Sequence, residues 1–307
     1  MRTISFLTIF CLCAAVNALA ADTSVNIEDG LYKEYDNAGN VRRLVTYAQG
    51  ALNGPFNVFY ENGTLKGEGV YEDGKIQGLA RTYYPSGALH TQMHYKDGQL
   101  HGDARAYYEN GQMKSEAHYL FGDRDGNVRE YSAEGKLLYT REYTLGMENG
   151  LAKEYDKEGN LLREADFIGG TQRGIIREYY PSGKVRRAFE AYDGVPIGTA
   201  KEYYSTGELK NEMVLIDGKP DGGTLKEYYK TGQLWKESNV EAGRKQGLFR
   251  EYYPQGAVKE TGIFYDDKPD GVFRQYYKNG YIASEIVYED GRKISSKEYD
   301  DFGNINE

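Results

Sequence analysis

Four histidines stand close together in this sequence, and imidazole is the side chain that most commonly binds metal ions in proteins. They are His90, His94, His101 and His118. His94 and His118 are 24 residues apart, and equivalent positions in successive β-hairpins lie ~9.6 Å apart. That distance is wide for two ligands that must each approach a zinc ion to ~2.0–2.1 Å. A metal site is therefore the weaker interpretation of this group, and we expect no metal or other cofactor.

Basic side chains recur at a fixed interval and suggest a track for an anion. A lysine or arginine lies two residues before a recurring aromatic residue in eleven of twelve repeats, with Asn57 as the exception. Glutamates recur in the segment expected to lie beside them. They are Glu68, Glu116, Glu164, Glu212, Glu237 and Glu285. Because the two signs of charge alternate, we expect a charge-balanced, solvated surface rather than a basic groove.

Tyrosine contributes 30 residues and forms two rows. An aromatic residue lies four positions before a recurring glycine, and in eight repeats a tyrosine follows it directly. These eight are Tyr60, Tyr84, Tyr108, Tyr180, Tyr204, Tyr229, Tyr253 and Tyr277. Adjacent strand residues point to opposite faces, so the two rows occupy opposite faces of a sheet.

The second row is interrupted, whereas the first row never loses its aromatic residue. The interruptions are Asp36, Ser132, Asp156 and Asp300. A structural row cannot skip positions cheaply, because each unit is stabilised mainly by its neighbours. We therefore predict that the first row holds the sheet together and that the second row contacts a partner, since exposed tyrosines favour protein or glycan contacts.

The motifs of common catalytic sites are missing from the sequence. It has no G-x-S-x-G elbow, phosphate-binding loop, dinucleotide fingerprint or H-E-x-x-H zinc motif. Both cysteines, Cys11 and Cys13, lie within the first 20 residues, so the remainder of the chain has no thiol chemistry. We therefore expect no enzymatic activity. A hydrolase with an unrecognised site in the irregular centre is the least favoured function.

A 24-residue repeat positions all of these side chains. Its glycines are Gly39, Gly63, Gly87, Gly111, Gly135, Gly159, Gly183, Gly207, Gly232, Gly256, Gly280 and Gly303. The spacing is 24 throughout, except for one interval of 25 and a final interval of 23. A fixed period of this size is typical of a repeat array, in which each unit buries its apolar surface against its neighbours.

Residues 78–102 show what one repeat encodes. The sequence predicts a strand over 79–84, a turn at Pro85-Ser86-Gly87, a second strand over 88–95 and a connection over 96–102. Pro85 and Ser86 suit the central positions of a type I turn, and Gly87 suits the left-handed position that closes a three-residue hairpin. A residue with a side chain would have to hold a positive φ there, which explains the recurring glycine.

That turn also predicts how the strands pair. The residue four before each glycine should face the residue two after it, and the latter is aliphatic in all twelve repeats. One step further from the turn, Glu178 should face Arg186 and Glu202 should face Lys210. The predicted fold is all-β: tandem β-hairpins in an elongated, twisted, single-layer antiparallel sheet, resembling an open β-solenoid.

The first twenty residues have the features of a secretory signal peptide. Arg2 supplies a positive charge, residues 4–16 are apolar, and Ala18-Leu19-Ala20 is a small-residue cleavage site. The apolar run is shorter than the ~20 residues of a spanning helix, which makes a membrane anchor the less favoured alternative. Cleavage between Ala20 and Ala21 leaves residues 21–307 as a single array of about twelve repeats. We expect this array to be periplasmic or secreted from a bacterial cell.

The formal net charge of the chain is −9. Phosphate backbones and anionic lipid surfaces repel an acidic protein, so we expect neither nucleic-acid binding nor electrostatic attachment to membranes.

The pattern EYYxxGxL…DGxxxG resembles the MORN (membrane occupation and recognition nexus) repeat, in the variant found in bacterial antitoxin-like proteins. Residues 178–185 with 193–198 carry the pattern, as do residues 202–209 with Asp217-Gly218. The resemblance covers residues 28–307 and implies tandem hairpins that act as an interaction scaffold. The repeat is a structural unit that hosts many roles. Cytoplasmic antitoxin action conflicts with the leader, and phosphoinositide binding conflicts with the acidic charge.

These observations predict a non-enzymatic, exported scaffold that binds another protein, with an immunity-like role as one form of that function. A module that binds cell-wall glycan, with sugars stacked on the tyrosine rows, is the first alternative.

Overall fold

The computed structural model describes residues 28–306, whose regular structure consists of 26 strands and the turns between them. The described residues divide into two compact units between Gln99 and Leu100. The leader, including the expected cleavage site at Ala20 and Ala21, lies outside the described residues.

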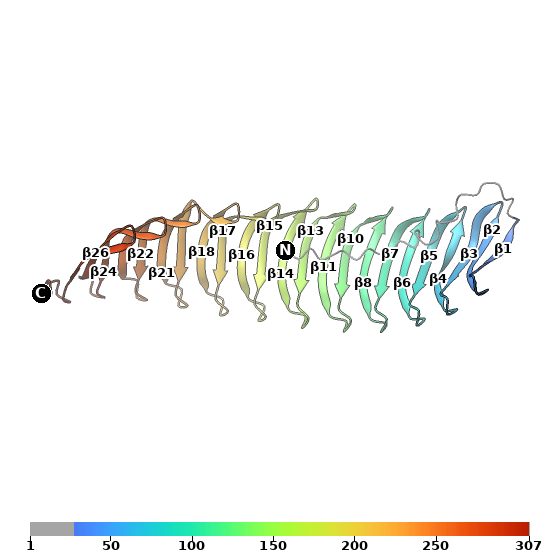
Figure 1. Ribbon diagram of the computed structural model, residues 1–307, viewed down its shortest axis with the longest axis horizontal. Helices are drawn as coiled ribbons and strands as arrows, with labels where there is room; N and C mark the ends of the chain where they lie inside the picture. Colours follow the sequence, from blue (N-terminus) through green and yellow to red (C-terminus); the bar gives the residue numbers. More distant parts are fainter. Residues whose placement is uncertain (1–27, 307) are drawn as a thin grey trace. The chain divides into compact units, whose positions relative to one another are not determined.

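The first unit is a row of strands, each antiparallel to its neighbours in the chain. The strands are β1 (Gly30–Tyr35), β2 (Val41–Ala48), β3 (Ala51–Phe59), β4 (Leu65–Glu72), β5 (Lys75–Tyr83) and β6 (Leu89–Lys96). They lie side by side in one layer (Figure 1).

The second unit repeats the same arrangement from β7, which begins at Gln99. Its long strands are β7 (Gln99–Tyr107), β8 (Met113–Leu120), β10 (Gly126–Tyr131), β11 (Leu137–Thr144), β13 (Gly150–Tyr155), β14 (Leu161–Ile168), β15 (Thr171–Tyr179), β16 (Val185–Tyr192), β17 (Val195–Tyr203), β18 (Leu209–Ile216), β20 (Gly223–Tyr228), β21 (Leu234–Glu241), β22 (Arg244–Tyr252), β23 (Val258–Tyr265), β24 (Lys268–Tyr276), β25 (Ile282–Glu289) and β26 (Arg292–Glu298). Three two-residue strands, β9 (Asp123–Arg124), β12 (Met147–Glu148) and β19 (Lys219–Pro220), precede β10, β13 and β20. The predicted single-layer antiparallel array of hairpins is confirmed in each unit.

The predicted turn is confirmed in its details. The Gly87 amide donates to the Tyr84 carbonyl at 2.8 Å, and Gly87 has a φ of 87°. The Tyr84 amide donates to the Ala88 carbonyl at 2.8 Å, which closes the hairpin. Tyr83 faces Leu89, and the equivalent aromatic–aliphatic pair is present in every repeat.

The predicted register one step further from the turn is wrong by one residue. Glu178 faces Arg187 rather than Arg186, because a β-bulge lies between Glu178 and Tyr179 and inserts an extra residue. The bulge still leaves the Arg186 guanidinium 2.7 Å from the Glu178 carboxylate. Glu202 likewise faces Asn211 while Lys210 contacts its carboxylate at 3.0 Å. The expected charge pairs therefore form across the bulge.

The connection predicted over 96–102 is a second hairpin turn. Asp97 and Gly98 both have positive φ, at 51° and 79°, as a two-residue type I′ turn requires. The strand that follows begins at Gln99, so each repeat holds two hairpins and longer strands than the sequence indicated.

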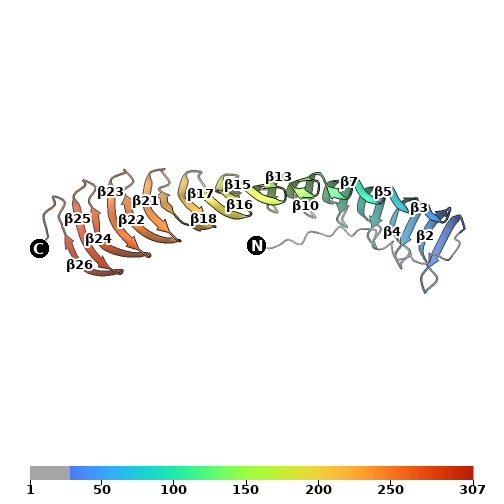
Figure 2. The ribbon, with the colours of Figure 1, turned by 90° about the horizontal axis from the view of Figure 1, so that it is seen from above.

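The core lies along one face of each curved sheet, where one repeat packs against the next. Val45 and Phe56 are essentially buried in the first unit, as is Ile176 in the second. Gly69 lies between Phe56 and Ala80, because a Cβ at Gly69 would come within 2.7 Å of the Phe56 ring and 3.2 Å of the Ala80 side chain. The strands of the second unit bend into arcs (Figure 2), and mid-strand bulges such as that between Ala188 and Glu190 account for the bending.

Candidate functional site

In six repeats, the tyrosine of the uninterrupted row joins its repeat to the preceding one through a glutamate. The Tyr83 hydroxyl donates to the Glu68 carboxylate at 2.7 Å, and Arg81 contacts the same carboxylate at 3.3 Å. Six repeats share this arrangement, with tyrosine–glutamate distances of 2.6–3.0 Å. Partial burial and the bond to Glu164 raise the pKa of Tyr179 to about 12. The predicted charge balance is confirmed here, because the basic residues of these repeats lie 2.8–3.6 Å from the glutamates.

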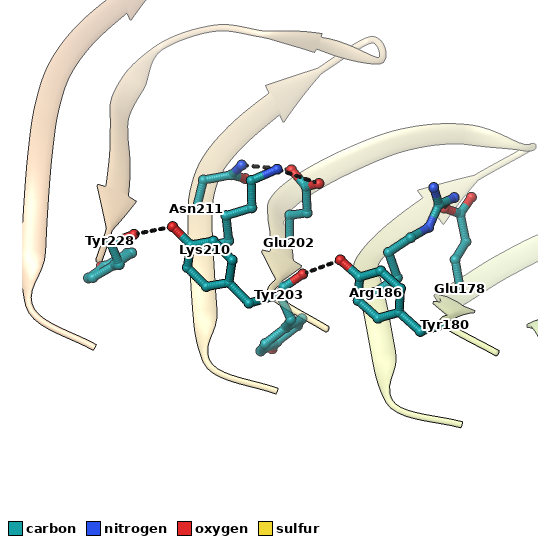
Figure 3. Close-up of polar contacts among 9 residues, drawn as sticks. Glu178, Tyr180, Arg186, Glu202, Tyr203, Lys210, Asn211 and Tyr228 are labelled. Carbon is teal, nitrogen blue, oxygen red and sulfur yellow. Dashed lines mark hydrogen bonds and ion pairs between the residues drawn. The ribbon is translucent and has the colours of Figure 1, made fainter. Parts of the chain in front are cut away.

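The interrupted tyrosine row also joins repeats, on the opposite face. The Tyr180 hydroxyl donates to the Tyr203 carbonyl at 2.8 Å, and the Tyr204 hydroxyl donates to the Tyr228 carbonyl at 2.8 Å (Figure 3). Tyr60, Tyr108, Tyr229, Tyr253 and Tyr277 make the same bond to the next repeat. The structure thus gives this row the linking role that the sequence assigned to the other row alone. Contact of a partner with these tyrosines stays a prediction.

Other side chains cover the rings of the interrupted row. Lys66 lies over the ring of Tyr60 and Lys114 over the ring of Tyr108, each with 5.4 Å between ammonium and ring centroid. The eighth member of the row, Tyr84, has its ring centroid 4.4 Å from that of His90, and Tyr229 packs against Trp235 at 5.8 Å. These rings are half-buried, so they offer little free surface.

A surface that sequence analysis missed lies along the type I′ turns of the second unit. Large apolar side chains there are 50–66% exposed. We define the apolar turn edge as Phe121, Leu145, Met147, Ile168, Tyr192 and Ile216. Successive turns are held beside each other, because the Gly146 amide donates to the Arg124 carbonyl and the Gly170 amide to the Glu148 carbonyl. Five turns at two strand spacings each span roughly 40 Å.

Phe121 and Leu145 occupy backbone positions that suit neither residue. Their φ values are 51° and 48°, in the left-handed region, where bulky side chains are uncommon and aspartate or asparagine is favoured. Aspartate fills the equivalent position at Asp73, Asp97 and several later turns. Phe121 is 66% exposed and Leu145 65% exposed, so burial in the core does not explain them.

Polar groups lie inside the sheet beneath these exposed apolar residues. Arg124 and Glu148 occupy the position that Ile76, 4% exposed, fills in the first unit. Arg124 Nη1 lies 3.4 Å from the Tyr143 hydroxyl, and Arg141 Nη1 lies 2.7 Å from Glu148 Oε1. Burial opposes the charge of Arg124, but its contacts with Tyr119 and Tyr143 raise its pKa overall. At these turn positions the usual arrangement of apolar residues inside and polar residues outside is inverted, while Tyr119, Val128 and Tyr143 around them are buried.

The histidines do not gather into a metal site. Among residues 28–306, no group of three or more histidine, cysteine, aspartate or glutamate side chains is placed to hold a metal ion. The His101 ring lies 4.9 Å from that of Phe121, while His94 and His118 face Leu79 and Asp103 on the neighbouring strands. Within the same range, no helix has the length and apolar character needed to cross a membrane.

The hairpin repeat and its bulged turn identify the chain's family. The chain belongs to the MORN repeat variant family, whose model matches it in nine segments that together cover more than half of the chain. The segments are residues 28–49, 52–73, 76–97, 100–120, 124–144, 148–168, 196–216, 221–242 and 269–290. Membership of this family indicates that the chain is a scaffold built from repeats.

Similar solved structures come from much larger toxin-complex proteins. The crystal structure of TcdB2-TccC3 aligns with 90% of this chain at 14% identity and a TM-score of 0.19. A Tc holotoxin pore of Photorhabdus luminescens with a mutation in TccC3 aligns with 88% at 13% identity and a TM-score of 0.19. This chain spans less than a fifth of the length of each, at 18% and 19%. No curated protein matches the chain.

Proposed function

We propose that this protein is an exported, non-enzymatic scaffold that binds another protein through the apolar turn edge. The inverted polarity at Phe121 and Arg124 carries the proposal. Phe121 is exposed in a left-handed turn, and Arg124 below it points inward. The equivalent pair of the first unit, Asp73 with the buried Ile76, serves folding better, so folding does not explain the central pair. Exposed apolar surface of this extent is a feature of interaction sites.

The exposed apolar residues are concentrated in five successive turns of the middle repeats, and Tyr265, 64% exposed, is the equivalent residue of one later turn. The equivalent turn residues are Glu72, Asp73 and Lys75 in the first unit, and Glu241, Ala242 and Arg244 later in the second. A partner that docks at the apolar turn edge therefore finds polar turns where the contact ends, which resembles the apolar centre and polar rim of protein interfaces. Tyr192 is held in position for such contact, because Arg173 stacks on its ring at 4.4 Å and bonds its hydroxyl.

Glycan binding has less support than protein binding. Sugars stack on open aromatic faces, whereas the rings of the interrupted row are half-buried and lie under Lys66, Lys114 or similar side chains. An immunity-like role, in which the scaffold shields an envelope component from a toxin, is the specific form of the proposal that the family resemblance favours. Export, which this role assumes, rests on the leader alone.

Site-specific crosslinking tests the proposal. A photoreactive phenylalanine analogue in place of Ile168 should crosslink to a discrete protein in extract from the native cell envelope. The same analogue in place of Glu241, which occupies the equivalent position in a polar turn, should not do so. Equal crosslinking at both positions, or crosslinks at neither, would remove the apolar turn edge as the binding surface. Recovery of peptidoglycan fragments alone would favour the glycan alternative.

A further inference from the structure

A surface hollow lies where the interrupted tyrosine row lacks a tyrosine in the middle of the second unit. It has a volume of about 450 Å³ and is lined by residues of two successive repeats, among them Glu154, Leu162, Arg163, Glu178, Tyr179 and Arg186. Tyr180 and Pro181 of the later repeat complete the lining. Asp156 stands at the position of the missing tyrosine in the earlier repeat and does not itself line the hollow.

The chain itself shows what fits at this position. In the next repeat, the Tyr180 ring occupies the equivalent place and its hydroxyl donates to the Tyr203 carbonyl (Figure 3). Seven repeats make this bond, at 2.7–2.9 Å. In these repeats the acceptor is the carbonyl of the aromatic residue one repeat later. The equivalent acceptor in the hollow is therefore the Tyr179 carbonyl.

Asp156 cannot replace the missing ring. Its carboxylate accepts bonds from the Glu158 and Asn160 amides at 3.0 and 2.8 Å, and from the Asn160 side chain at 3.0 Å. The side chain is therefore folded back onto its own turn. Hydrogen bonds from Asn160 hold the pKa of Asp156 below its ordinary value, so the group is an ionised acceptor with no proton to donate to a carbonyl.

The wall of the hollow differs from the surroundings of most of the tyrosines that are present. Leu162 occupies the position that Lys66 and Lys114 fill, where each lysine lies over a tyrosine ring. The repeat without a tyrosine thus presents an apolar side chain where an aromatic ring would rest. The hollow beside Asp36 in the first unit has Arg42 at this position and lacks that apolar wall.

We infer that this hollow binds a tyrosine side chain of the partner protein, which takes the place of the missing residue in the row. The inference rests on the proposed function, because it names a residue of the proposed protein partner. The partner's ring packs on Leu162, its hydroxyl donates to the Tyr179 carbonyl, and Glu178 and Arg186, paired at 2.7 Å, border it.

The test uses the whole protein and N-acetyl-tyrosinamide as the probe, so it does not depend on a captured partner. In methyl NMR spectra, titration should move the Leu162 methyl signals in a saturable manner. N-acetyl-phenylalaninamide, which lacks the hydroxyl, should bind about threefold or more weakly, the difference expected for one hydrogen bond. No movement of the Leu162 signals up to the solubility limit of the probe would overturn the inference.

Two variants locate the binding. Asp156→Tyr fills the hollow with the residue that eight other repeats carry, so it should abolish the response without lowering the melting temperature. Asp36→Tyr, the matched control in the first unit, should leave the response intact. If Asp156→Tyr fails to fold, Leu162→Lys replaces it, with binding followed through saturation transfer to the probe. Undiminished binding of the probe in the folded variant would overturn the inference. Failure of the crosslinking experiment at Ile168, with probe binding intact, would count only against the apolar turn edge.

Discussion

Left-handed backbone positions determine which side chains each repeat can carry, and two of the recurring positions can be tested by substitution. One is the glycine that closes the bulged turn, such as Gly183 with a φ of 80°. The other is the first residue of the type I′ turn, which is aspartate in most repeats and Phe121 or Leu145 in the centre. Substitutions at the first position test folding, whereas the departures from aspartate at the second position carry the proposed function.

Replacement of Gly183 by valine tests the first position. A Cβ at Gly183 would have no atom within 4 Å, so the expected destabilisation of about 1–3 kcal/mol comes from backbone strain alone. Lys184→Val, beside it on the exposed turn, is the control and should melt close to the wild type. Equal melting temperatures for the two variants would show that the glycine conformation does not matter to stability.

The hydrogen bond between Tyr179 and Glu164 makes stability depend on pH. The pKa of Tyr179 is raised from about 10 in the unfolded chain to about 12 in the folded chain. Its contribution is therefore fully present below pH 10 and is lost as the pH rises through 12. Tyr179→Phe should be less stable than the wild type at pH 8, with a difference that narrows between pH 10 and 12. A difference that stays constant across this range in denaturant titrations would contradict the assignment.

At the scale of the element, both tyrosine rows act as links between hairpins. The uninterrupted row donates to glutamates and the interrupted row donates to backbone carbonyls, as Tyr83 and Tyr60 illustrate. An isolated hairpin is marginally stable, so these links and the shared core hold the sheet together.

Removal of three hydroxyls tests the role of the interrupted row. Tyr204, Tyr229 and Tyr253, all changed to phenylalanine, lose one interrepeat hydrogen bond each while their rings remain. Each bond contributes about 1 kcal/mol, so we expect a loss of about 3 kcal/mol in denaturant unfolding. The control changes Tyr265 and Tyr281, which are 64% and 53% exposed, to phenylalanine. If the triple variant unfolds like this control, the row does not link the repeats.

Sequence reasoning predicted the hairpins because their determinants are local. Pro85, Ser86 and Gly87 specify a turn by backbone preference, and the turn specifies which residues face each other. It missed the hairpin at Asp97-Gly98, where the left-handed preference of aspartate is the only local signal besides the glycine. The acceptor of Tyr180 is a backbone carbonyl 23 residues away in the next repeat, and the sequence carries no local signal for that contact. The apolar turn edge could have been predicted from the sequence, because alignment of the repeats places Phe121 at the position that Asp73 fills.

At the scale of the whole molecule, the account requires that the protein leave the cytoplasm. The leader predicts cleavage after Ala20, so the mature protein from its native host should begin at Ala21. Intact mass spectrometry of that protein decides the matter. Retention of Met1 on a cytoplasmic protein would remove export from the proposal and return the antitoxin-like role to consideration.

The central claim is that the middle repeats carry apolar residues for a partner and not for the fold. The most direct measurement compares the partner affinity and melting temperature of the double variant Phe121→Asp, Leu145→Asp with those of the wild type. Aspartate is the residue of most equivalent turns, so this variant should melt no lower than the wild type while its affinity for the crosslinked partner falls at least tenfold. The matched control, Gln49→Asp with Ala242→Asp, changes the same turn position in polar turns and should keep full affinity. Unchanged affinity in the first variant, or a loss of affinity that accompanies a lower melting temperature, would contradict the account.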